Sequence, residues 1–259
     1  MNKQERVALA IKEVVSKMMD RVMENVLVND PFVKEKHHAS KPLYAALVPD
    51  EIFKGSHFER RFVTPFGGVW ERLAQVVAIE AHGHCVMGHT VNGTVGTESL
   101  RRIQEVLNRL EHSVKGIDKV KPDWKTELEY IKKGGGEPIP VSVTCDIFIH
   151  SEVTDTRYAF EFDKMPSDNF QIRGSKEKMF KLLAMNPQQV DFYFYALPYN
   201  ENYQDSLLTK WFSVQENEPV LTGDNFWNLI GEEGIYNEIM KEIFSIANKY
   251  KQKIYKEFL

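Results

Sequence analysis

Two neighbouring segments between residues 138 and 164 constrain the fold of this chain more than any other part of it. Residues 141–149 are apolar and rich in β-branched side chains, with one carboxylate, Asp146, inside the run. Residues 156–162 alternate polar and apolar side chains and lead into Asp163 and Lys164. Both patterns are typical of β-strands, and the polar residues between them predict a turn that pairs the two strands.

The strand pair carries three carboxylates at one end. Side chains alternate between the two faces of a strand, so Glu161 and Asp163 are expected to point the same way. If the strands pair, Asp146 reaches the same end of the sheet. Oxygen ligands in this number, next to a lysine, suit Mg²⁺. The alternative is a solvated charged rim. An unpaired carboxylate inside an apolar run is costly, and either a metal ion or a lysine would remove that cost.

Composition leaves several protein classes open. The 259 residues are enough for one large domain or two small ones, and the net charge of -4 neither indicates nor excludes a nucleic-acid partner. Cys85 and Cys145 do not form a disulfide framework and fit a reducing compartment. The first residues lack a signal-peptide pattern and no apolar run is long enough for a membrane span, so a cytoplasmic protein is expected.

Apolar periodicity predicts several helices and one more strand. An aromatic run at residues 190–198 predicts the third strand, and the order strand, strand, helix, strand is α/β in character. Thr64-Pro65 is interpreted as a helix start, and Ser175 as the N-cap of the helix after the acidic strands. The helices are expected over residues 5–27, 64–79, 98–114, 122–132, 175–185 and 224–258, the last interrupted at 231–234.

Histidines between residues 82 and 89 offer a weaker indication of a metal site. His82, His84 and His89 near Cys85 are ligand types for zinc, but their spacing matches no closed four-ligand pattern. The glycines in this stretch, with Asn92-Gly93 between β-formers, favour a β-hairpin carrying surface histidines.

Four ordered blocks carry a resemblance to known nucleases. They are residues 58–71, 139–149, 158–171 and 226–239. Asp146 followed by Glu161-x-Asp163 resembles the PD-(D/E)xK nuclease core, and the set of blocks resembles type II restriction endonucleases of the TdeIII type, which cut GGNCC. The resemblance implies an α/β fold with a mixed central sheet flanked by helices. It also implies a single endonuclease domain over 1–259, with an N-terminal helical part at 1–56 and C-terminal helices at 224–259.

The same resemblance implies a function and a set of residues. The expected activity is Mg²⁺-dependent hydrolysis of double-stranded DNA at a short palindromic site by a homodimer in a prokaryotic cytoplasm. The expected catalytic residues are Asp146, Glu161, Asp163 and Lys164; the metal ligands are Asp146, Glu161, Asp163 and Glu71; the DNA contacts are Arg60, Arg61, Gln171, Arg173, Lys176 and Lys178.

The chain departs from the family pattern at one of the expected catalytic positions. The pattern is F-E-x-K, whereas here Asp163 occupies the lysine position and Lys164 follows it. A bulge could turn Lys164 inward, Asp163 could act as a third ligand or as the base, or the site could be inactive. The second account is preferred, with Lys176 or Lys178 as sources of positive charge. Two other functions stay open: a nuclease of this fold without a restriction role, and a DNA-binding homologue with impaired catalysis.

Overall fold

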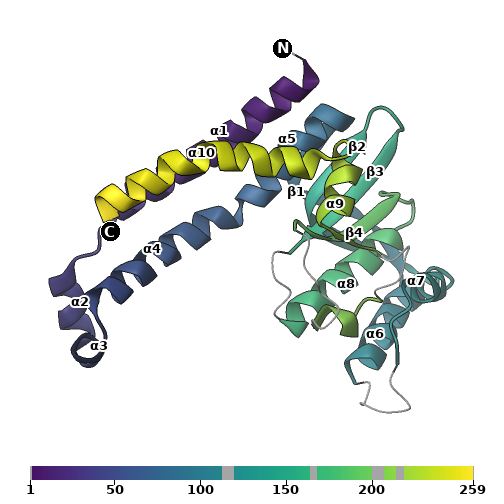
Figure 1. Cartoon of the computed structure of the whole chain (residues 1–259). Coiled ribbons are helices and arrows are strands. Elements are labelled where there is room, and N and C mark those ends of the chain that lie inside the picture. Colours follow the sequence, from purple (N-terminus) through teal and green to yellow (C-terminus); the bar gives the residue numbers. More distant parts are fainter. Residues whose placement is uncertain (1, 113–119, 164–167, 200–206, 214–218, 259) are drawn as a thin grey trace. The chain divides into compact units, whose positions relative to one another are not determined.

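The computed structural model describes residues 2–112, 120–163, 168–199, 207–213 and 219–258 (Figure 1). The chain divides into two compact units, one formed by residues 1–76 with 237–259 and one by residues 77–236. The single-domain interpretation stays a prediction.

The first unit is helical, and its core lies along α1. In the first helix, residues at helical spacing are buried, including Val7, Ile11 and Val22. The hydroxyl of Tyr250 donates to Asp20 Oδ1 at 3.0 Å, which joins α10 to α1. The helices are α1 (Lys3–Glu24), η1 (Asn25–Asn29), α2 (Lys34–Ser40), α3 (Pro42–Leu47), α4 (Asp50–Gly67), the first part of α5 (Val69–His82) and most of α10 (Ile235–Phe258).

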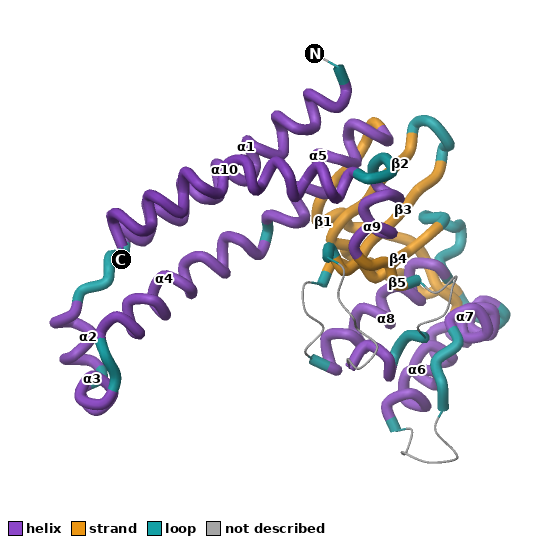
Figure 2. The backbone as a smooth tube through the Cα atoms, in the orientation of Figure 1, coloured by secondary structure: helices purple, strands orange, loops and turns teal. Residues whose placement is uncertain are grey.

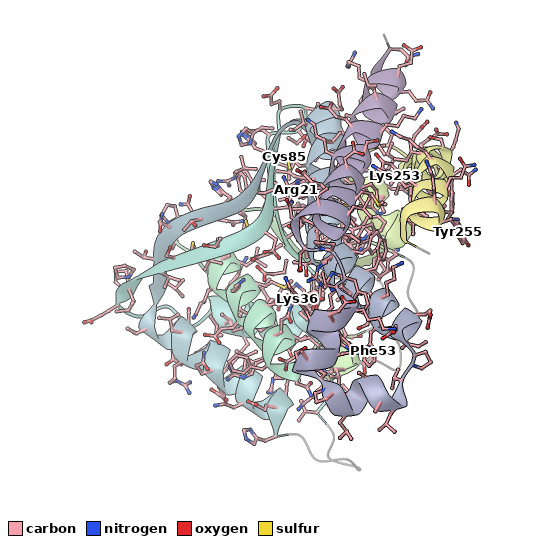
Figure 3. All side chains as sticks on the ribbon, turned by 90° about the vertical axis from the view of Figure 1, so that its left-hand side faces the viewer. Arg21, Lys36, Phe53, Cys85, Lys253 and Tyr255 are labelled. Carbon is pink, nitrogen blue, oxygen red and sulfur yellow. The ribbon has the colours of Figure 1, made fainter. Side chains whose placement is uncertain are left out.

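Side-chain contacts within this unit also tie the short helices to α4. The rings of His37 on α2 and Phe53 on α4 lie 4.1 Å apart between centroids. Figure 3 labels Phe53 on α4, Lys36 on α2 and Arg21 on α1. The polar segment Lys34–Ser40 forms α2.

The second unit is built on a five-stranded mixed sheet in the order β1-β2-β3-β4-β5 (Figure 2). The first three strands pair antiparallel, and β3, β4 and β5 pair parallel. The strands are β1 (Gly83–Gly96), β2 (Pro138–Ser151), β3 (Thr156–Phe162), β4 (Phe192–Leu197) and β5 (Val220–Thr222). The predicted α/β class and the mixed central sheet flanked by helices are therefore confirmed.

Helices cover both faces of β3. On one face α8 (Asn169–Leu183) packs on β2 and β4, together with α6 (Thr97–Glu111) and α7 (Trp124–Lys132). On the other face the ring of Phe226, from α9 (Gly223–Ile230), makes edge contacts with Phe160 and Phe162. Because side chains alternate along a strand, Glu161 faces the α8 side.

Three sequence predictions for local structure differ from the structure. The glycine-rich stretch after His82 is not a hairpin: β1 is one continuous strand, paired along its length with β2. Thr64-Pro65 does not start a helix but lies inside α4. The helix after the acidic strands begins at Asn169 with Asp168 as its N-cap, so Ser175 is an interior residue.

Candidate active site

Asp146 lies where β2 and β3 separate. The antiparallel ladder ends at the pair Ile147 and Phe160, so Asp146 and Glu161 occupy the next opposite positions. The Phe162 backbone N–H donates to Asp146 Oδ2 at 2.7 Å. The carboxylate thus accepts a backbone bond from the neighbouring strand, which fixes it beside Glu161.

An interruption in β2 explains this placement. Cys145 belongs to the buried cluster below α8, and Phe148, three residues later, packs against the same cluster. In a regular strand these two side chains would face opposite sides, so the alternation shifts by one residue between them. On β1 the position opposite Asp146 is Gly88, whose positive φ of 61° suits glycine. Asp146 sits at this shift.

Glu161 is buried and held by three side chains. The Tyr193 hydroxyl donates to Oε1 at 2.5 Å, the Ser175 hydroxyl donates to Oε2 at 3.2 Å, and the Lys178 ammonium lies 2.9 Å from Oε2. Tyr193 comes from β4, and the other two come from α8. These contacts to both oxygens fix the orientation of the Glu161 carboxylate.

The surroundings of Glu161 disfavour its charged form. Burial raises the pKa of Glu161, the charge of Asp146 raises it further, and the bonds from Tyr193 and Lys178 lower it without reversing the shift. Burial and the Glu161 charge also raise the pKa of Cys145, to about 12. A buried carboxylate in this state, with a second carboxylate beside it, favours a bound cation.

Asp163 follows β3 and has a tyrosine of its own. The Tyr195 hydroxyl donates to Asp163 Oδ2 at 2.5 Å, and the Asp163 backbone N–H donates to Ala196 O at 3.0 Å. Tyr193 and Tyr195, two residues apart on β4, thus donate hydrogen bonds to Glu161 at the end of β3 and to Asp163 just after it. Lys164 lies outside the described residues.

The donor chemistry fits Mg²⁺. This ion is commonly held by one or two carboxylates, with water and substrate phosphate completing its coordination. Asp146 and Glu161 are adjacent, and the charge of Asp146 adds to burial in raising the pKa of Glu161. Across the described part of the chain, no cluster of three or more His, Cys, Asp or Glu side chains is arranged to hold a metal ion. That holds for His82, His84 and His89, and also for the three acids of the strand pair.

Two of the basic residues expected at DNA are committed to contacts within the protein. Lys176 is fully buried, lying 2.6 Å from Glu127 Oε2 and donating to the Trp211 carbonyl. Its ammonium has no surface on which to meet DNA, so the DNA contact expected for it is withdrawn. Arg173, largely buried, binds Glu111 and Glu177 at 3.1 and 3.5 Å.

The other predicted residues are divided between the two units. Gln171 is exposed on α8. Arg60 is exposed on α4, whereas Arg61 on the same helix pairs with Asp30. Glu71 is half-buried on α5 within the first unit. The geometry within the second unit therefore bears on Asp146, Glu161 and Asp163 and leaves the roles of Arg60, Arg61 and Glu71 as predictions.

Sequence reasoning missed the residues that hold the acids. Tyr193, Tyr195 and Ser175 were not among the candidates, although each donates to a carboxylate of β3. A signal was present for the tyrosines, because they alternate with phenylalanines in a strand and so share a face. Ser175 carried no such signal.

The mixed sheet, with paired acids where two strands separate, is consistent with a restriction-endonuclease-like α/β fold. A family model described as "Type II restriction endonuclease, HinfI" matches residues 8–249. The chain therefore belongs to the HinfI family of type II restriction endonucleases.

Named relatives agree with this assignment. The type II restriction enzyme HgiBI of Herpetosiphon aurantiacus is 22% identical over 216 residues, which are 78% of this chain and 75% of that protein. The type II restriction enzyme HgiCII of the same organism is 21% identical over 227 residues, 85% of this chain and 82% of that protein. None of the described helices is long and apolar enough to cross a membrane.

Proposed function

We propose that this chain is a Mg²⁺-dependent type II restriction endonuclease whose hydrolytic centre is the carboxylate pair Asp146 and Glu161. The observation that carries the proposal is the convergence of these two acids where β2 and β3 separate. When bound, Mg²⁺ supplies positive charge at the scissile phosphate and lowers the pKa of water. Such a role would place the protein in a prokaryotic cytoplasm.

The residues of the chain have separate tasks in this proposal. Asp146 and Glu161 hold the cation, and Tyr193 and Ser175 fix the oxygens of Glu161 so that its geometry is set before DNA arrives. Asp163 is proposed as the third acid of the centre, held by Tyr195, either as a further oxygen ligand or as the acceptor of the water proton. Glu71 is proposed as an outer ligand of a second metal ion.

Recognition is proposed to be palindromic. A two-fold homodimer would present one centre to each strand of a symmetric site. GGNCC is the first sequence to test, since the four blocks resemble enzymes that cut it. Guanine edges in the major groove are read by arginine or lysine side chains, and exposed Arg60 is a proposed reader. Gln171, also exposed, is proposed as a further DNA contact.

A pair of linear duplexes tests recognition and assembly. One contains a single GGNCC site, and the other has the same composition with the site scrambled. The proposal predicts two product fragments from the first duplex in Mg²⁺, none from the second, and a dimer by sedimentation. Cleavage of both duplexes alike would support a nuclease without sequence specificity, and binding without cleavage would support an impaired DNA-binding homologue.

A further inference from the structure

Three carboxylates lie at one end of the strand pair, those of Asp146, Glu161 and Asp163, and the ammonium of Lys178 lies beside Glu161. DNA brings further negative charge at each phosphate, and more develops on the phosphoryl oxygens as water attacks. The family pattern supplies a lysine from the strand, but that position holds Asp163.

Lys178 is placed to supply a positive charge here. Its ammonium lies 2.9 Å from Glu161 Oε2, yet its side chain is 44% exposed, whereas the side chain of Glu161 is only 5% exposed. The lysine therefore lies between the buried carboxylate and solvent. A lysine ammonium has three donors, and the bond to Glu161 uses one of them.

The other basic side chains of α8 point to different partners. Lys176 is buried against Glu127, Arg173 pairs with Glu111 and Glu177, and Lys181 pairs with Glu177 at 2.7 Å. These three lie against acids of α6, α7 or α8 itself. Of the four, Lys178 is the one whose described ion pair is with an acid of the strand pair.

We propose that Lys178 is the catalytic lysine of this centre, contacting the scissile phosphate from α8 in place of the lysine that the strand lacks. The proposal rests on the proposed nuclease function. In the reaction, the water oxygen forms a bond to phosphorus while the bond from phosphorus to the leaving sugar oxygen breaks. The water proton passes to the surroundings and the leaving oxygen takes a proton. Lys178 remains an ammonium throughout and donates a hydrogen bond to a non-bridging oxygen as its charge grows.

The test compares Lys178→Ala with Lys181→Ala, a matched loss of one lysine from the same helix. Single-turnover cleavage in Mg²⁺ is expected to fall by about 10²–10³-fold in the first variant and to stay near wild type in the second. Lys178→Arg keeps the charge and is expected to recover at least part of the rate. Duplex affinity measured in EDTA, and Mg²⁺ binding to the protein alone by calorimetry, are expected to change less than about threefold, since one phosphate contact among several is lost.

Each outcome decides between the claims. Lys178→Ala cleaving like wild type, or losing duplex affinity as steeply as it loses rate, would overturn the role of Lys178 and leave the nuclease function standing. A loss of Mg²⁺ binding in Lys178→Ala would reduce the lysine to a structural partner of Glu161. A wild-type protein that cleaves no duplex would overturn the proposed function, and this inference with it.

Discussion

The hydroxyl of Tyr193 on β4 donates a 2.5 Å hydrogen bond to Oε1 of Glu161 on β3. The hydroxyl of Tyr195, two residues later on β4, donates a 2.5 Å hydrogen bond to Oδ2 of Asp163, which directly follows β3. Parallel pairing creates this arrangement, because it places Ala159 beside Tyr193 and Glu161 beside Tyr195 on the same face of the sheet. The acids of the proposed centre are therefore held by the neighbouring strand as well as by α8.

Tyr193→Phe removes one donor to Glu161 and leaves the ring in place. The Tyr193 bond lowers the pKa of Glu161, so its loss raises that pKa, and the acid limb of the cleavage–pH profile moves to higher pH. A hydrogen bond to a charged group contributes about 1.5–3 kcal/mol, so a rate loss of roughly tenfold or more is expected. Tyr130→Phe, which removes an exposed bond to Glu105, is the control, and an unmoved acid limb in Tyr193→Phe would contradict the account.

Glu161→Gln is expected to abolish cleavage and stabilise the protein. The folded pKa of Glu161 lies above its ordinary value, so ionisation weakens the folded state as pH rises above about 4. The neutral amide removes that penalty, and thermal unfolding at pH 8 should shift upward by about 2–4 °C. The gain should disappear at pH 4. Glu129→Gln, on the exposed side of α7, serves as the reference. A melting temperature for Glu161→Gln below that of wild type at pH 8 would contradict the raised pKa of Glu161.

Because Lys176 is buried, we expect it to stabilise the fold and not to contact DNA. Lys176→Met leaves Glu127 buried without its partner, which is expected to cost about 3–5 kcal/mol of unfolding free energy. The double variant Lys176→Met/Glu127→Leu should recover most of this loss. Lys181→Met breaks a more exposed pair and should cost at most about 1 kcal/mol. Denaturant unfolding measures the stability of all three variants. A Lys176→Met protein as stable as wild type would contradict the burial of this pair.

Asp163→Asn tests the residue at which the chain departs from the family pattern. Asparagine keeps an oxygen to accept from Tyr195, so the fold should be unchanged. Cleavage is expected to fall by about 10²-fold, in the range for losing a positioned acid or base. Weaker Mg²⁺ binding by calorimetry would identify Asp163 as a ligand, whereas unchanged Mg²⁺ binding with a flattened pH profile would identify it as the proton acceptor. Full activity in Asp163→Asn would remove it from the centre.

The sequence predicts the acids of the site better than their surroundings. Asp146 and Glu161 stand out because a carboxylate in an apolar strand is energetically unusual. Tyr193, Ser175 and Lys178 reach Glu161 only through the crossover from β3 through α8 to β4, and such long-range pairing leaves little trace in local patterns. Ser175 in particular resembles an N-cap, but the N-cap of this helix is Asp168, seven residues earlier.

Errors in local structure have equally specific causes. Asn92-Gly93 is a strong hairpin signal, yet β1 runs straight through it, because continuous pairing with β2 outweighs the turn preference. Pro65 was expected to open a helix, but α4 continues through it for two more residues. The one-residue shift in side-chain alternation at Gly88 and Asp146 could not be predicted from strict alternation along a strand. This shift turns Asp146 toward β3.

A plasmid digest tests the central claim that the Asp146 and Glu161 pair hydrolyses DNA. Wild type, Asp146→Asn and Asp155→Asn are incubated with supercoiled plasmid in Mg²⁺ and in EDTA. Asp155, an exposed turn residue of the same strand pair with φ of 51°, is the matched control, because asparagine tolerates this conformation well. The account predicts discrete fragments from wild type and Asp155→Asn in Mg²⁺ only, and intact plasmid with Asp146→Asn. Fragments from Asp146→Asn at the wild-type rate, or cleavage that persists in EDTA, would contradict it.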